Sequence, residues 1–191
     1  SAAFLLELGR VLSKRPKSYS LWLVFIRETG PGSEDPSLED SPQPTPWREV
    51  ERLATEFEQA GVLDRVRVAV FFDGLGDPEA AALRDSHSHP IYREVFWESA
   101  RDLGATDLFP PDAGFESSHV GHHALIQEGL RRTVLVTTGA GTQAPAPSEL
   151  GDARGRAEAF QRVGDVSLEA INRIQTRLAR MDQLSGSSRP E

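Results

Sequence analysis

Residues 67–77 read RVAVFFDGLGD, and this stretch decides the fold. It contains the continuous apolar run Val68 to Phe72 and then stops on Asp73 and glycines that permit a sharp turn. A short apolar run with this ending predicts a buried central strand of an α/β sheet. Ligands of open α/β sheets gather beyond the carboxyl ends of the strands, where Asp73 would lie. The alternative interpretation is that Asp73 only begins a turn.

The rest of the chain alternates between strand and helix patterns. Two further β-branched or aromatic runs predict central strands at Tyr19–Ile26 and Thr133–Thr138, and Pro78–Asp85 is predicted to be a turn that leads to a short edge strand. A predicted N-cap, Ser88, precedes one helix, whose apolar face would carry Ile91, Val95, Phe96 and Ala100. Helical spacing of apolar residues predicts helices over Ala2–Ser13, Trp47–Ala60, Pro90–Leu103, His122–Leu130 and Val166–Met181. This order predicts an α/β fold with three layers, in which helices cover both faces of a mostly parallel central sheet.

Composition bounds the possible functions. The chain has 191 residues, enough for one α/β domain over 1–191, and a net charge of -8. The charge argues against nucleic acid as a partner, because no basic face is available to neutralise phosphates. Cysteine is absent, which excludes disulfides and thiolate metal sites. No apolar run approaches the roughly 18 residues of a membrane span, so we expect no membrane span.

Three segments read as irregular. Residues 30–46 and 139–156 are rich in Pro, Gly, Ala and Ser and are predicted to be mobile loops, and residues 184–191 are predicted to be a disordered tail. A loop of such length inside a compact domain is either functional or disordered.

The histidines give the second chemical signal. All 5 lie between positions 87 and 123, as His87, His89, His119, His122 and His123. Imidazole is the commonest metal ligand, and a catalytic zinc needs about three protein ligands with an open position for water. Asp73, Glu28 and one histidine of the 119–123 cluster would supply that set if they converge at one sheet edge. The alternative is that the histidines are incidental surface residues, since their spacing matches no simple zinc motif; His87 and His89 are predicted to be capping or solvent residues.

Several stretches together resemble the zinc-dependent exopeptidase superfamily, which includes bacterial aminopeptidases and glutaminyl cyclases. FLLELGR at 4–10 is similar to the family's ALLELAR helix, and LWLVFIRETG at 21–30 is similar to its VVFVFxxEExG strand. FDGLGD at 72–77 resembles LDMVGD, and SHSHP at 86–90 lies where cyclase-like members have xNSxPE. HHALIQEG at 122–129 keeps the spacing of HLPFLEAG, and VSLEA at 166–170 resembles the closing VxPExL helix.

The resemblance implies a zinc site at the carboxyl edge of the sheet and a substrate at the amino terminus of peptides. By position, Asp73 matches a carboxylate that binds metal in the two-zinc peptidases, and His122 matches the family's last metal ligand, with His119 as the alternative. Glu28 is either the general base or a ligand. Family members are often exported, so the resemblance also suggests a periplasmic or secreted protein.

The departures from the family pattern are equally specific. The Glu–Glu pair of the family is reduced to Arg27-Glu28 or Glu28-Thr29, and Gly121 replaces the carboxylate before the family's histidine. The family's first metal-ligand segment precedes the helix matched at 4–10, and this chain begins just after it. Two hypotheses therefore remain: a zinc aminopeptidase or glutaminyl cyclase with an impaired site, or a non-catalytic relative that serves as a binding or scaffold module.

Overall fold

A computed structural model describes residues 2–26, 45–75, 80–116, 122–138 and 153–186. The predicted ligands Glu28 and His119 lie outside these residues. The described elements, in chain order, are α1 (Ala2–Leu12), α2 (Thr45–Gln59), a 3₁₀ turn (Leu63–Arg65), β1 (Ala69–Asp73), β2 (Arg84–Asp85), α3 (Pro90–Asp102), β3 (Phe115–Glu116), α4 (His122–Gln127), β4 (Thr133–Thr137) and α5 (Ala153–Gly186). Among the described helices, none is both long and apolar enough to cross a membrane.

The centre of the fold is the parallel pair of β1 and β4. The two strands run in register from Ala69 opposite Thr133 to Asp73 opposite Thr137, and every residue of β4 is buried. Burial on both faces explains the apolar centre of β4, Val134 to Val136. The short strands β2 and β3 also pair in parallel, which confirms the predicted parallel α/β class.

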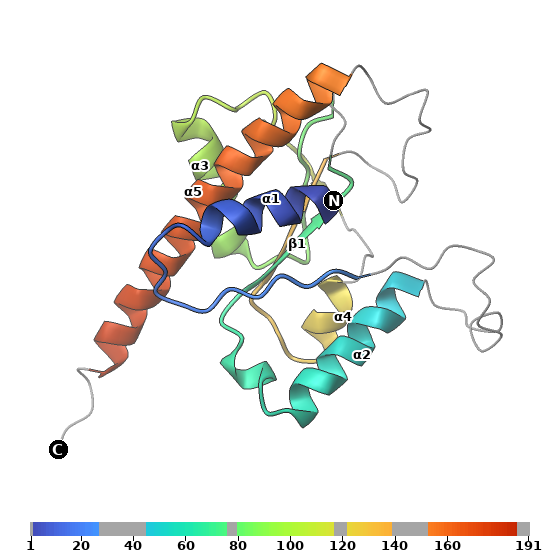
Figure 1. Cartoon of the computed structure of the whole chain (residues 1–191), viewed down its shortest axis with the longest axis vertical. Helices are drawn as coiled ribbons and strands as arrows, with labels where there is room; N and C mark the ends of the chain where they lie inside the picture. Colours follow the sequence, from blue (N-terminus) through green and yellow to red (C-terminus); the bar gives the residue numbers. More distant parts are fainter. Residues whose placement is uncertain (1, 27–44, 76–79, 117–121, 139–152, 187–191) are drawn as a thin grey trace.

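Helices cover both faces of this pair (Figure 1). On one face α1, α3 and α5 enclose the larger core, against which Phe72 packs, and Phe4 of α1 lies 5.1 Å from Phe72 between ring centroids. On the other face α2 and α4 form a second cluster that Phe71 joins. Neighbouring residues of β1 thus enter different cores, as the alternation of a strand requires. The three-layer prediction is confirmed.

The prediction of a central strand at Tyr19–Ile26 is wrong for the described structure. The segment is extended but belongs to no sheet, and Leu21 to Phe25 keep between 37% and 62% of their surface exposed. It passes between α1 and α2: Leu23 lies against Gly9, and Trp22 packs edge-on against Phe57. A strand needs a neighbour that offers hydrogen bonds, and no described residue does so here.

Other differences concern element ends. Ser88 does not cap α3; His89 takes the N-cap position without a side-chain hydrogen bond. Ile91 is exposed, and Tyr92 and Trp97 are buried in its place. Helix α5 begins well before the predicted 166 and runs to 186, so residues 153–156 and 184–186 of the predicted loop and tail are helical, as are residues 45–46 of the first loop, while residues 30–44, 139–152 and 187–191 lie outside the described residues.

Candidate functional site

Asp73 lies at the carboxyl end of β1 and is exposed. One of its carboxylate oxygens accepts a hydrogen bond of 2.9 Å from the backbone N–H of Gly74. Gly74 has a φ of +58°, and a side-chain Cβ there would lie 3.3 Å from Thr137 Oγ1 and from the Thr138 carbonyl oxygen. The turn therefore needs glycine, and it holds a carboxylate at the sheet edge where ligands of such folds collect.

His122 opens α4 and is fully buried. Its Nε2 lies 3.0 Å from the Oδ2 of Asp85, whose side chain is equally buried. The imidazole ring also packs against Phe71, with 6.0 Å between ring centroids. We assign the proton of this hydrogen bond to Nε2, since an ionised Asp85 carboxylate can only accept.

Asp85 is the centre of a wider network. It accepts hydrogen bonds from the backbone N–H of Ser88 at 2.6 Å and from the Ser88 hydroxyl at 2.8 Å. The same hydroxyl accepts a hydrogen bond from the backbone N–H of Leu135 in β4. His87 Nδ1 lies 3.7 Å from Asp85 Oδ1, and its ring centroid is 4.3 Å from that of His123. Asp85 thus ties the start of α3 and the start of α4 to the central strand.

Sequence reasoning did not identify Asp85 as the partner of His122. A local signal was present, since Asp85 accepts a hydrogen bond from the backbone N–H of Ser88, three residues later, just before a helix that starts with proline. No local pattern could pair Asp85 with His122, because His122 comes 37 residues later in the chain.

The two predicted ligands that the structure describes are thus in different environments. Asp73 is exposed at the strand end, whereas His122 is enclosed and bonded to Asp85. The one nitrogen of His122 with a lone pair to offer, Nδ1, is buried and makes no hydrogen bond with any described residue. Across the described part of the chain, no group of three or more His, Asp or Glu side chains is spaced to hold a metal ion.

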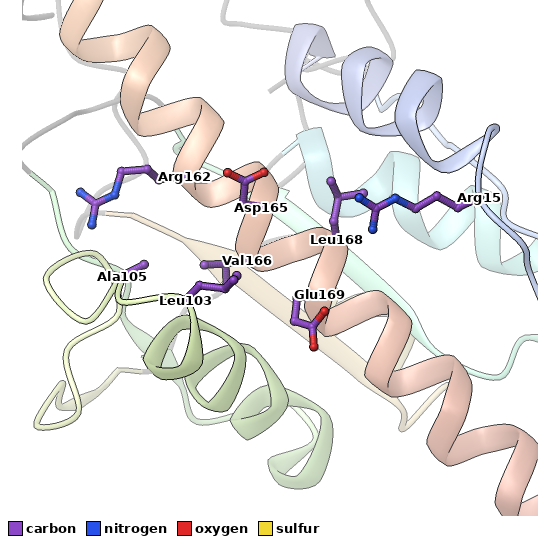
Figure 2. Close-up of a pocket in the computed structure, with 8 residues that line it drawn as sticks. All are labelled: Arg15, Leu103, Ala105, Arg162, Asp165, Val166, Leu168 and Glu169. Carbon is purple, nitrogen blue, oxygen red and sulfur yellow. The ribbon is translucent and has the colours of Figure 1, made fainter.

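A separate hollow of about 280 Å³ lies between the end of α1, the end of α3 and α5 (Figure 2). Charged side chains line it, but Arg162 pairs with Asp107 and Glu169 pairs with Arg173. None of the predicted site residues lines this hollow. Two of its four charged side chains are thus held in ion pairs with residues outside the hollow, which we interpret as a surface depression of the helical layer.

The fold itself has a solved counterpart. The chain superposes on the crystal structure of a glutaminyl cyclase from an Acidobacteriales bacterium with a TM-score of 0.69 and 20% sequence identity. The fold is glutaminyl cyclase-like. The match covers 92% of this chain and 60% of that one, so this chain spans about three-fifths of the length of the cyclase. No protein-family model and no curated protein matches the sequence.

This finding confirms the predicted fold resemblance and nothing finer. That cyclase has the α/β fold of the zinc exopeptidases, which the six matched stretches indicated. At 20% identity the likeness extends to the arrangement of elements and not to activity, metal or substrate.

Proposed function

We propose that this chain is a glutaminyl cyclase-like binding module that takes up the amino terminus of a peptide at Asp73 without zinc-dependent catalysis. The observation that carries the proposal is the contrast between the exposed Asp73 and the enclosed His122. An exposed carboxylate at the carboxyl edge of a parallel sheet offers a partner for an ammonium group. His122, in contrast, is already hydrogen-bonded to the buried Asp85, so in this proposal it supports the core.

The test compares peptides that differ only at the amino terminus. Short peptides with a free amine should bind in titration calorimetry, and the same peptides with an acetylated amine should bind about two- to fivefold more weakly, as expected for an ion pair at an exposed carboxylate. The variant Asp73→Asn, which keeps the shape of the side chain and removes its charge, should lose this preference. Equal binding of free and acetylated peptides would refute the proposal.

A second candidate is the zinc enzyme that the family resemblance implies, acting as an aminopeptidase or a glutaminyl cyclase. One observation favours it. Histidines that bind metals commonly donate their other N–H to a carboxylate, and His122 donates Nε2–H to Asp85 in this manner. Asp73, Glu28 and His122 would then hold the zinc, with Glu28 as base or ligand and His119 as the alternative histidine. The zinc would polarise a carbonyl or activate a water.

Elemental analysis separates the two candidates. Protein purified without chelators should contain far less than one zinc per chain if the module is non-catalytic, and added zinc should produce no peptidase or cyclase turnover. About one zinc per chain, reduced in Asp73→Asn, would favour the enzyme. Asp73→Asn suits this purpose better than a substitution of the buried His122, because the Asp73 side chain is exposed and losing its charge leaves the core intact.

A further inference from the structure

The amino-terminal edge of the β1–β4 pair gathers several polar side chains. Arg67 precedes β1 and Arg132 precedes β4, and the backbone N–H of Ala69 donates to the Arg132 carbonyl at 3.0 Å. The backbone N–H of His89, at the start of α3, donates to the carbonyl of Thr133 at 2.8 Å. The first turn of α3 is therefore fixed beside the chain that carries Arg132.

Arg132 lies on the face of the sheet that α3 and α5 cover. Val134 and Val136 of β4 enter the larger core on that face, and side chains alternate along an extended chain, so Arg132 is on the same side. Its side chain is half-buried, and it makes no hydrogen bond or ion pair with any described residue. The guanidinium, which carries five N–H donors, is thus available to a ligand.

Tyr92, in the first turn of α3, adds a hydroxyl to this edge. Only 3% of the residue is exposed, and its ring centroid lies 4.8 Å from that of His89. The hydrogen bond with Asp182 is the main cause that raises the pKa of Arg67, and the Tyr92 phenol, which is near enough to act on that guanidinium, adds to the effect. The hydroxyl makes no hydrogen bond with any described residue, yet it keeps contact with solvent. Buried tyrosines usually find a partner for the O–H group, so this hydroxyl is a donor suited to a ligand.

The carboxylate that faces these cations is already neutralised. Asp182 of α5 accepts two hydrogen bonds from Arg67, at 2.7 and 2.9 Å, and a third from the Tyr19 hydroxyl at 2.6 Å. Burial and then the charge of Arg132 lower the pKa of His89, which places the guanidinium close to the imidazole. Of these described groups, two cations face one carboxylate, so this edge carries an excess positive charge on a chain whose net charge is -8.

We propose that Arg132, Tyr92 and His89 bind a free tetrahedral dianion of the sulfate or phosphate class. The guanidinium and the hydroxyl donate hydrogen bonds to its oxygens, and the imidazole lies beside it. Donors from a strand end and from a helix approach the ligand from different directions. Four tetrahedral oxygens satisfy such donors better than the two coplanar oxygens of a carboxylate.

Chemical-shift titration of the full 191-residue chain with sodium sulfate tests the site, with sodium chloride at equal ionic strength as the reference. We expect saturable shifts at Arg132, Tyr92 and His89 with a Kd on the order of 1 mM, since a few charge-assisted hydrogen bonds must offset the entropy of association. Arg132→Gln should raise this Kd at least about fivefold, and Tyr92→Phe about two- to fivefold. Inorganic phosphate should bind with a similar Kd, and acetate should bind more weakly than either.

Arg131→Gln is the matched control. Arg131 is the exposed neighbour of Arg132, so this variant removes the same charge from the same part of the chain and should change Kd less than about twofold. Arg132→Gln should fold normally, because its guanidinium has no bond to a described residue to lose, and thermal melts verify this. Equal weakening by the two variants would mean a general effect of charge and would overturn the site.

The titration of His89 gives a second readout that a general effect of salt would not move. A bound dianion favours the charged imidazole, so sulfate should raise the pKa of His89 relative to chloride. By linkage, the Kd for sulfate should fall about two- to fivefold from pH 7.5 to 5.5, a range over which sulfate keeps its charge. His89→Gln should abolish this pH dependence and retain binding at pH 7.5.

Two results would overturn the proposal outright. One is the absence of saturable shifts at about 20 mM sulfate, well above the expected Kd. The other is a pKa of His89 that is the same in sulfate and in chloride. Asp73 lies at the opposite end of β1, and its peptide binding is measured in chloride, so failure of either proposal leaves the other standing.

Discussion

Replacing His122 with alanine should destabilise the protein far more than any substitution at Asp73. His122 Nε2 and Asp85 Oδ2 are 3.0 Å apart, and both side chains are fully buried. Removing the histidine withdraws one hydrogen bond from a buried carboxylate, which costs about 1.5–3 kcal/mol, and leaves a cavity in place of the buried ring, so the total loss is about 3–5 kcal/mol. Two hydrogen bonds from Ser88 continue to support Asp85, which favours the lower part of this range.

The magnitude translates into a measurable shift. We expect His122→Ala to lower the free energy of unfolding by about 3–4 kcal/mol, which is a large share of the roughly 5–15 kcal/mol of a typical domain. For a chain of this size each kcal/mol lowers Tm by about 2–4 °C, so the melting temperature should fall by roughly 6–16 °C. Urea denaturation and thermal melts followed by circular dichroism measure both quantities.

A double-mutant cycle verifies that the loss comes from the pair. His122→Ala, Asp85→Asn and the double variant should show a coupling energy above about 1 kcal/mol, since residues in one hydrogen-bond network are not additive. A loss below about 1 kcal/mol for His122→Ala, or additive losses in the double variant, would refute the structural role assigned to the histidine.

Three further predictions follow from the site and its surroundings. Asp73→Asn should change the free energy of unfolding by less than about 0.5 kcal/mol, because the side chain is exposed; a larger loss in urea denaturation would mean that the carboxylate supports the fold. Gly74→Ala should cost about 1–2 kcal/mol, as φ is +58° and the new Cβ would crowd Thr138; an unchanged urea midpoint would contradict this conformation. Burial and the nearby Arg132 lower the pKa of His89, so the folded state binds fewer protons than the unfolded state. The contribution of His89 to the free energy of unfolding is therefore full above pH of about 6.5 and is lost as the pH falls through the lowered pKa. His89→Gln should therefore show a smaller loss of stability between pH 7.5 and 5.5 than the unsubstituted chain, and parallel curves would exclude His89 as the source.

The parts of the fold that follow from local patterns were predictable. The apolar runs of β1 and β4 needed burial on both faces, and the amphipathic helices around them had to provide it. The prediction of a strand at Tyr19–Ile26 was wrong because strand formation there does not follow from the local pattern alone. Its residues have strand character, but forming a sheet depends on a neighbour whose presence no local pattern reports.

The candidate site was predictable in its individual residues and not in their pairing. Asp73 lies at the carboxyl end of a central strand, where the sequence placed it. The predicted grouping of His122 with Asp73 depends on the spatial neighbours of the histidine, and Asp85 occupies its Nε2. Spacing along the chain can rank a histidine as a ligand, but only the three-dimensional arrangement shows which carboxylate it contacts.

The position of His122 also determines which substitution can separate the two proposed functions. Asp85 occupies Nε2 of His122, so Nδ1 is the nitrogen that remains for a ligand. If zinc binds there, Asp85 orients its ligand, and Asp85→Asn should weaken zinc binding about 10–100-fold. If the module binds only peptide amino termini, the same variant should lose stability while peptide affinity at Asp73 is retained. His122→Ala cannot make this distinction, because it removes the ligand and the core contact together.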